Sequence, residues 1–181
     1  DHNFLTIAER CSDHLTEVSK SSIRQWLWKV RSKQVLIAQG MHERPQVISG
    51  NDIPGVMLSS AVRGYVNKYG VVPGRSVVIC TNNDDAYRTA ITLHKSGIKV
   101  SGIVDSRKNQ TAELLKITKK YNFKVFLGHI IVSIHGKNSV KAVEVAPINE
   151  DATDIASLPF KIPTDLVAMS GGWTPIVSLF S

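Results

Sequence analysis

Residues 76–127 read SVVICTNNDDAYRTAITLHKSGIKVSGIVDSRKNQTAELLKITKKYNFKVFL, and this stretch decides the fold. Short apolar runs bounded by polar residues are typical of buried strands, and segments with apolar residues at helical spacing separate them here. The predicted strands are 76–80, 99–104 and 124–127, and the predicted helices between them are 84–96 and 112–121. Strands that alternate with helices predict parallel strands joined by right-handed crossovers. The sequence therefore predicts an α/β fold with a Rossmann-like βαβαβ unit.

On the C-terminal side, this unit is followed by a predicted antiparallel hairpin and a last strand. The segments 130–135 and 140–147 resemble strands and are joined by a short turn that contains glycine and asparagine. The segment 151–164 is polar with two prolines, and it predicts a loop. A final apolar run at 166–169 predicts a strand that ends at Ser170-Gly171-Gly172.

On the N-terminal side, the sequence predicts one helix and two strands. Apolar residues at helical spacing predict a helix over 56–66. The apolar run 35–38, ended by Gln39 and Gly40, predicts a buried strand. The imperfect alternation of apolar and charged residues over 23–30 predicts a half-buried strand.

Two predicted strands that end in glycine, one at Gly40 and one at Gly171-Gly172, flank the βαβαβ unit. We infer that the unit is inserted into a neighbouring domain and that its two flanks lie side by side in one sheet. Two unrelated turns at strand ends are the alternative. The predicted segments are 1–55, the end of the first domain; 56–162, the inserted domain; and 163–181, the return into the first domain.

The composition excludes several classes of protein. Of 181 residues, 43% are hydrophobic and 20% charged, which fits a globular domain with a small appendage and excludes a disordered or collagen-like chain. Lys and Arg number 22 against 15 Asp and Glu. The net charge of +7 suits nucleic acid, anionic lipid or a phosphorylated cofactor without choosing among them. The two cysteines are too few for a disulfide scaffold and fit a reducing, cytoplasmic compartment.

The sequence predicts no membrane span. Its longest apolar stretch, 125–134, is too short to cross a bilayer. The chain begins at Asp1, and no signal-peptide pattern follows. We therefore expect a soluble protein that is a processed chain or a segment of a larger one.

The turn that follows strand 76–80, Thr81-Asn82-Asn83-Asp84, is the first candidate binding site. In a dinucleotide-binding unit, a glycine-rich turn here brings backbone N–H groups and a helix N-terminus to a pyrophosphate. The glycines are absent, but Asn tolerates left-handed backbone, so Asn82 and Asn83 can shape the turn. Asp84 suits the positive end of the helix dipole but repels phosphate. The turn predicts a degenerate phosphate site, and simple capping of the helix is the alternative.

Asp105 ends the next strand, where an acidic residue of a dinucleotide-binding unit holds the ribose hydroxyls. Arg107 is close enough in sequence to indicate a 2′-phosphate instead, and an ordinary polar loop is the alternative. A glycine at a strand end lets phosphates approach the backbone. The candidate cofactor-binding residues are therefore Gly40, Asn82, Asn83, Asp105, Gly171 and Gly172.

Other constellations carry less information. The six histidines lack the spacing of metal ligands, so we predict no metal site. Trp26 and Trp28 share one strand face beside basic residues, which is typical of single-strand nucleic-acid binding but also of a sheet face packed on a helix. The sequence has no P-loop, G-x-S-x-G turn or kinase motif, and we predict no catalytic residue.

Four blocks of sequence, taken in order, resemble one protein family. VLIAQGMHERP at 35–45 resembles the V-L-A-T-G-A-x-E-R-P stretch of flavoproteins with two dinucleotide-binding domains. The other blocks are NDIPGVML at 51–58, TNNDDAYR at 81–88 and SGGWTP at 170–175. Together they are similar to the alpha subunit of heterotetrameric sarcosine oxidase over most of the chain from Ile23 to Phe180.

The resemblance implies a place in a larger enzyme. The chain would be the end of a first dinucleotide-binding domain, an inserted second one and the return into the first, within a much longer alpha subunit. The assembled enzyme of this family oxidatively demethylates sarcosine and uses FAD, FMN, NAD and tetrahydrofolate. The resemblance also implies that an upstream domain outside this chain holds most of the NAD, that a flavin on the beta subunit oxidises sarcosine, and that this chain alone is inactive. The implied partners are the remaining subunits, with no nucleic acid and no membrane.

The sequence departs from the family pattern at two positions. Gln39 replaces the usual Thr and Met41 replaces a small residue, which changes the groups that meet the cofactor. Related opine-oxidising and cyanide-forming flavoprotein subunits share the architecture and are alternatives. Two further hypotheses are a stand-alone NAD(H)-binding module that uses Asn82, Asn83 and Asp105, and nucleic-acid binding through the positive charge, which weakens steeply with salt.

Overall fold

A computed structural model describes residues 2–17, 19 and 22–178. The chain divides into two compact units, one of Asp1–Gly40 with Val177–Ser181 and one of Met41–Ile176. Residue 1, at the start of the predicted first segment, and residues 179–181, at the end of the predicted last segment, lie outside the described residues.

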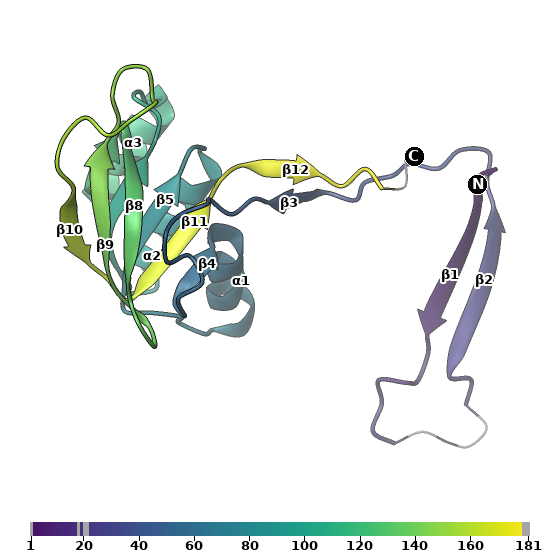
Figure 1. Cartoon of the computed structure of the whole chain (residues 1–181). Helices are drawn as coiled ribbons and strands as arrows, with labels where there is room; N and C mark the ends of the chain where they lie inside the picture. Colours follow the sequence, from purple (N-terminus) through teal and green to yellow (C-terminus); the bar gives the residue numbers. More distant parts are fainter. Residues whose placement is uncertain (1, 18, 20–21, 179–181) are drawn as a thin grey trace. The chain divides into compact units, whose positions relative to one another are not determined.

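The larger unit is built on a five-stranded parallel sheet in the order β4-β11-β5-β6-β7 (Figure 1). Its strands are β4 (Val56–Leu58), β5 (Ser76–Thr81), β6 (Lys99–Asp105), β7 (Val125–Leu127) and β11 (Leu166–Ser170). Helices α2 (Asp85–Lys95) and α3 (Ala112–Tyr121) join β5 to β6 and β6 to β7. The predicted βαβαβ unit is therefore confirmed. The strand β11, which is the last of these five in sequence, is an interior strand between β4 and β5.

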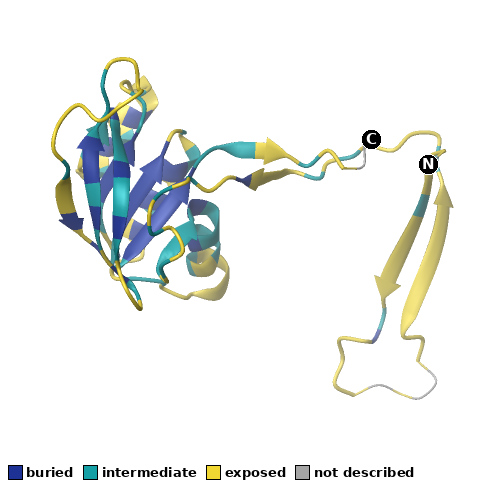
Figure 2. Cartoon of the chain, in the orientation of Figure 1, coloured by how far each residue is buried: buried dark blue, intermediate teal, exposed yellow. Residues whose placement is uncertain are grey.

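This sheet is covered on both faces. Helices α1 (Ser59–Tyr69), α2 and α3 lie on one face, and an antiparallel sheet lies on the other (Figure 1). Val77 and Ile79 of β5 pack with the helices, whereas Val78 and Cys80 pack with the antiparallel sheet. Figure 2 shows the buried residues concentrated in the strands between these layers. Burial on both faces explains why β5 is a continuous apolar run rather than an alternating one.

The antiparallel sheet contains the predicted hairpin. Its strands are β8 (His129–Gly136), β9 (Val140–Pro147) and β10 (Phe160–Pro163), in the order β10-β9-β8. The hairpin of β8 and β9 is confirmed. The predicted loop 151–164 is partly wrong, because its last residues form β10 and pair with β9. Since β10 is an edge strand, it tolerates the proline that made this segment look like a loop.

Residues next to the helices cap α3 at its start and end α1. The Thr111 hydroxyl accepts a hydrogen bond from the Leu114 N–H at 3.3 Å and caps α3. Gly70, with φ of 63°, ends α1 in the left-handed conformation. The predicted start of this helix is wrong, because residues 56–58 form strand β4 and α1 begins at Ser59.

Two short strands after the glycine-containing segments pair with each other. β3 (Met41–Glu43) and β12 (Trp173–Pro175) form an antiparallel ribbon. The predicted strand 35–38 is wrong: Leu36 is 95% exposed, and no residue from 32 to 40 is in a strand. The prediction that strands ending at Gly40 and Gly171 share one sheet is therefore also wrong. Four apolar residues do not make a strand where no neighbour supplies backbone hydrogen bonds.

The observed units are bounded differently from the predicted segments. Residues 41–55 and 163–176 belong to the same compact unit as the predicted inserted domain, 56–162. The strand β11, which falls in the predicted return segment, is an interior strand of the parallel sheet of this unit. The division into 1–55, 56–162 and 163–181 stays a prediction.

The smaller unit contains one antiparallel hairpin, β1 (Phe4–Arg10) with β2 (Gln25–Arg31). The sequence predicted β2 but not β1, whose surrounding residues are polar and lack a clear period. The expected half-burial of β2 is wrong, because all of its residues are exposed. The Trp26 and Trp28 rings lie 6.3 Å apart, and Trp28 donates a 2.7 Å hydrogen bond to Glu9. A two-stranded sheet on its own has no second layer in which to bury side chains.

Candidate functional site

The candidate site lies at the carboxyl edge of the parallel sheet. Ser170 at the end of β11 is in register with Thr81 of β5, and Thr81 is in register with Asp105 of β6. The segments that follow these strands therefore meet at one edge, which is where open α/β sheets bind ligands. Five predicted residues converge there: Asn82, Asn83, Asp105, Gly171 and Gly172. Gly40 belongs to the smaller unit.

The two asparagines hold the turn together. The Asn83 amide nitrogen donates to the Ser170 hydroxyl at 2.9 Å, and its oxygen accepts from the Asp85 N–H at 3.1 Å. The Asn82 amide donates to the Gly171 carbonyl at 3.4 Å. Neither asparagine has a positive φ, so the predicted left-handed turn is wrong. Asn83 caps α2 and ties it to β11, which is the alternative that the sequence left open.

Carboxylates surround the start of α2. Asp84 forms an ion pair with Arg107, with Nη1 and Oδ1 2.5 Å apart. Asp85 accepts two hydrogen bonds from Arg63, at 2.8 and 3.2 Å, and lies 3.9 Å from Arg88. The helix dipole favours an anion at this position, but the acidic side chains already supply one. A phosphate placed here would face two carboxylates.

Asp105 is the centre of a closed network. Its side chain is fully buried, and Oδ1 accepts from the Arg107 backbone N–H and Nε, both at 3.0 Å. Oδ2 accepts from Arg107 Nη2 and from the Tyr87 hydroxyl, both at 2.8 Å. The Tyr87 oxygen in turn accepts from the Gln110 amide at 2.9 Å.

This network shifts the pKa values of Tyr87 and Arg107. Burial, together with the Asp105 charge, raises the pKa of Tyr87, so its hydroxyl stays protonated and donates. The hydrogen bonds to Asp105 raise the pKa of the Arg107 guanidinium. All four hydrogen bonds that the Asp105 carboxylate accepts therefore come from donors of the protein itself. Its predicted role as a ribose acceptor stays a prediction, and that role requires Arg107 to move.

Two hollows flank the start of α2. One, of about 140 Å³, lies between α2 and α3 and is lined by residues that include Asp84, Tyr87 and Thr111. It is smaller than the roughly 300–1,000 Å³ of typical small-molecule sites. The other, of about 330 Å³, is lined by Met41, Arg63, Asp85 and Trp173. The larger hollow therefore has the size for part of a ligand, and it adjoins the β3–β12 ribbon.

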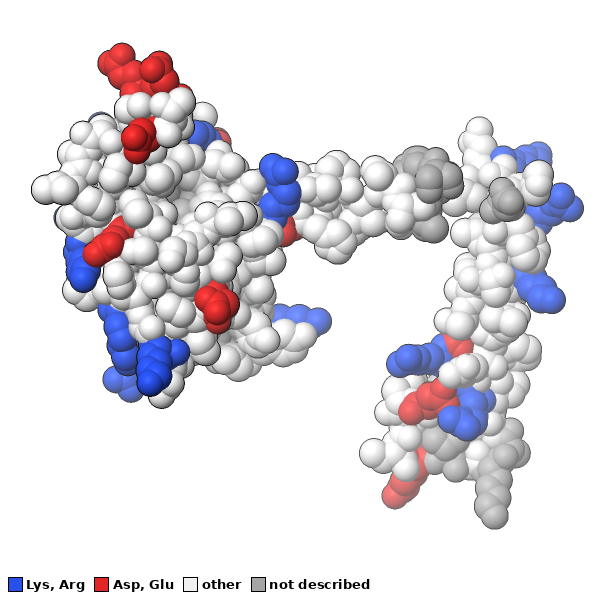
Figure 3. All heavy atoms as spheres, in the orientation of Figure 1, with Lys and Arg blue, Asp and Glu red and all other residues white. Residues whose placement is uncertain are grey.

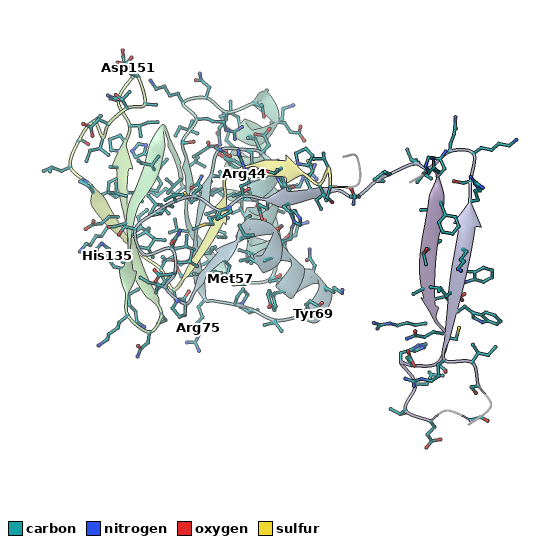
Figure 4. All side chains as sticks on the ribbon, turned by 45° about the vertical axis from the view of Figure 1, so that its right-hand side comes forward. Arg44, Met57, Tyr69, Arg75, His135 and Asp151 are labelled. Carbon is teal, nitrogen blue, oxygen red and sulfur yellow. The ribbon has the colours of Figure 1, made fainter. Side chains whose placement is uncertain are left out.

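The glycines at this edge serve two different purposes. A side chain on Gly171 would lie 2.9 Å from the carbonyl oxygens of Arg44 and Pro45, so this glycine permits two chain segments to touch. Its predicted purpose, to admit a ligand, conflicts with this close contact. A side-chain carbon added at Gly172, with φ of +97°, would meet no atom closer than 3.7 Å, and one added at Gly40, with φ of +79°, would meet none within 4 Å. Figure 4 shows Arg44 where the ribbon joins the larger unit.

Sequence reasoning missed two residues that anchor the ribbon. Glu43 is 7% exposed, and its Oε2 accepts from the Ser60 N–H at 2.8 Å, which caps α1. Its Oε1 has no hydrogen-bond partner among the described residues. Gln46 accepts from the Cys80 thiol at 2.5 Å. The sequence did contain one indication of this cap. Leu58 stands at the N-cap position of α1 and has no side-chain acceptor, so a capping group has to come from elsewhere in the chain.

Two kinds of feature are absent from the described residues. No group of three or more His, Cys, Asp and Glu residues in this part of the chain is arranged to hold a metal ion. No helix formed by the described residues has the length and apolar character needed to cross a membrane.

Comparison with known proteins connects this chain to one enzyme. Sarcosine oxidase subunit alpha from Corynebacterium sp. is 35% identical over 184 residues, which include 100% of this chain. The subunit alpha from Rhizobium meliloti is also 35% identical, over 99% of this chain. The resemblance to the alpha subunit of sarcosine oxidase is confirmed. The chain spans only 19% and 17% of the length of these two relatives.

A more distant relative and the solved structures agree with the fold. A hydrogen cyanide synthase subunit from Pseudomonas protegens is 25% identical over 83% of this chain and 36% of its own length. Thioredoxin reductase from T. acidophilum has a TM-score of 0.63 at 21% identity, over 83% of this chain and 47% of that structure. Thioredoxin reductase from Lactococcus lactis has a TM-score of 0.60 at 13% identity, over 98% and 55%. The chain thus has the fold of flavoprotein oxidoreductases. No family model matches the sequence.

Proposed function

We propose that this chain is a structural segment of the alpha subunit of a sarcosine oxidase-like flavoenzyme, an oxidoreductase that acts as part of a complex. The whole enzyme would oxidatively demethylate sarcosine. The observation that supports this most strongly is 35% identity over the whole chain to proteins of that name, of which the chain spans about a fifth. The flavoprotein fold agrees with it. We further propose a cytoplasmic location and a heterotetrameric assembly.

The carboxyl edge of this sheet does not fit a dinucleotide in the arrangement described. Asp105 is saturated by Arg107 and Tyr87, and Asp84 and Asp85 surround the helix N-terminus. We therefore propose that most of the NAD of the complete enzyme is held by polypeptide outside this chain, as the resemblance implies. FAD, FMN and tetrahydrofolate would also belong to the complete enzyme. This chain would supply scaffold.

We propose that any contact between this chain and the cofactor lies at the part of the carboxyl edge next to the β3–β12 ribbon. The 330 Å³ hollow is lined there by Met41 and Trp173, which follow Gly40 and Gly172 in sequence. The six candidate residues remain Gly40, Asn82, Asn83, Asp105, Gly171 and Gly172. Among the three glycines, Gly40 and Gly172 leave more room for an added side chain than Gly171 does.

The isolated chain provides the first test. We expect it to purify colourless and to consume no oxygen with sarcosine. A stoichiometric flavin absorption band in the purified chain would contradict the scaffold role. The alternative of a stand-alone NAD(H)-binding module is tested by calorimetric titration with NAD(H), repeated on Asp105→Ala. Heat that is present in the original chain and lost in this variant would support the module.

The substrate is tested on the assembled enzyme that contains this chain. We expect oxygen uptake with sarcosine. The relative named as a hydrogen cyanide synthase subunit makes a cyanide-forming enzyme the second candidate. Cyanide release without sarcosine-dependent oxygen uptake would favour the cyanide-forming enzyme.

A further inference from the structure

The amino edge of the parallel sheet, opposite the candidate site, is basic. Strands β5, β6 and β7 each start with or directly after a basic residue, namely Arg75, Lys99 and Lys124, and both α2 and α3 carry lysine in their last turn. Residues 114–143 include six lysines and no acidic residue. Figure 3 shows several Lys and Arg side chains at the lower end of this unit and a group of Asp and Glu at its upper end, with further charged side chains of both signs between them. Basic side chains therefore predominate at this edge, where Asp165, just before β11, accepts hydrogen bonds from the Arg75 and Ser76 N–H groups.

A hollow of about 410 Å³ opens at this basic edge. Its lining includes His94, Lys99, Tyr121, Asn122 and Phe123. Three rings pack together on it: Tyr121 and Phe123 stack with centroids 5.4 Å apart, and His94 meets Phe123 edge-on at 5.6 Å. Aromatic rings beside exposed lysines give the hollow an apolar wall and a positive rim.

Local structure explains only part of this charge. Lysines in the last turn of α2 and α3 suit the negative end of the helix dipole. That explanation does not reach Lys99 and Lys124, which lie at strand starts. Within the part of the chain that the structure describes, neither of them forms an ion pair, and the Lys124 Nζ lies over the Phe126 ring, 4.9 Å from its centroid. Unneutralised like charges repel one another, and an anionic partner would relieve that repulsion.

We propose that this basic edge docks an acidic segment of another polypeptide, which places an apolar or aromatic side chain in the hollow. A buried apolar anchor surrounded by a charged rim is the usual anatomy of a protein interface. Single-strand nucleic-acid sites instead present free ring faces in succession for stacking. Here Tyr121 and Phe123 stack on each other, which favours a peptide over a nucleic acid.

The test measures binding of a fluorescent acidic peptide, mostly glutamate with one central phenylalanine, to the full chain by anisotropy. The edge variants are Lys99→Glu and Lys124→Glu. The control is Lys108→Glu, which makes the same charge change at the opposite edge, where Lys108 bonds only a backbone carbonyl. We expect each edge variant to weaken binding about tenfold and the control less than about twofold. Replacing the peptide phenylalanine with serine should weaken binding several-fold, because the hollow is then unfilled.

Three outcomes would overturn the proposal. The first is no measurable binding by the unchanged chain at low salt. The second is equal loss in Lys99→Glu and Lys108→Glu, since net charge alone would then explain the affinity. The third is a duplex or single-stranded DNA oligomer that binds more tightly than the peptide and is weakened by the same edge variants. Circular dichroism of each variant verifies that a loss of binding does not reflect unfolding.

Discussion

Replacing Arg107 with methionine should lower the unfolding free energy of the larger unit by about 2–3 kcal/mol. Arg107 supplies three of the four hydrogen bonds to the fully buried Asp105 carboxylate, and methionine keeps only the backbone one. Removing one partner of a buried ion pair costs about 3–5 kcal/mol. Because the Arg107 side chain is 32% exposed, water reaches the vacated position, which reduces the expected cost to about 2–3 kcal/mol.

Urea unfolding followed by circular dichroism measures this change. At about 4 °C per kcal/mol for a unit of this size, the melting temperature should fall by about 8–12 °C. Lys108→Met is the control, because Lys108 is exposed and bonds only a backbone carbonyl, and it should cost less than about 0.5 kcal/mol. Asp105→Asn combined with Arg107→Met completes a double-mutant cycle. The double variant should cost at least about 1 kcal/mol less than the sum of the single variants.

Two results would refute this reasoning. If Arg107→Met costs no more than Lys108→Met, the pair adds no stability and solvent already reaches Asp105. If the two single changes are additive, Arg107 and Asp105 do not act as a unit. In either case, the interpretation that Arg107 closes the predicted ribose position is wrong.

Three further predictions concern the packing around the ribbon and the core. Burial raises the pKa of the Cys80 thiol from 9.0 to about 12, so the unfolding free energy should fall as pH rises from 9 towards 12. Near neutral pH, a thiol reagent should modify Cys11 in the native protein but reach the buried Cys80 only after unfolding. Glu43→Ala should cost about 1–2 kcal/mol in urea unfolding by removing a helix cap, and Glu43→Gln, which keeps an acceptor, should cost clearly less; equal losses would contradict the capping role. Gly171→Ala should destabilise by about 1–3 kcal/mol because its new methyl group meets two carbonyl oxygens, whereas Gly64→Ala, in α1 with open space around it, should stabilise by about 0.5–1 kcal/mol; melting temperatures that move in the same direction would contradict this contrast.

Local signals were sufficient for most of the elements in the larger unit. The apolar run of β5 is continuous because both of its faces are buried, and such a pattern is visible in sequence. Thr111 and Gly70 end their helices through interactions within a few residues, so their roles are also visible in sequence. The strand β10 and the ribbon strands β3 and β12 were missed, because three or four residues carry too little periodic signal and their pairing partners are distant in the chain.

The candidate site, too, was predictable from the sequence only in part. The sequence by itself determined that Asn82 and Asn83 follow one strand and that Asp105 ends the next, and parallel strands bring their carboxyl ends to one edge. Only the tertiary structure decided that Arg107 turns back to saturate Asp105, that Glu43 caps a helix in another segment, and that β11 inserts between β4 and β5 in the sheet. The physical reason is that helix caps and strand periods arise from near neighbours, whereas burial and pairing depend on which distant segments come into contact. A sequence pattern shows which residue can accept a hydrogen bond, but only the folded chain shows which donor reaches it.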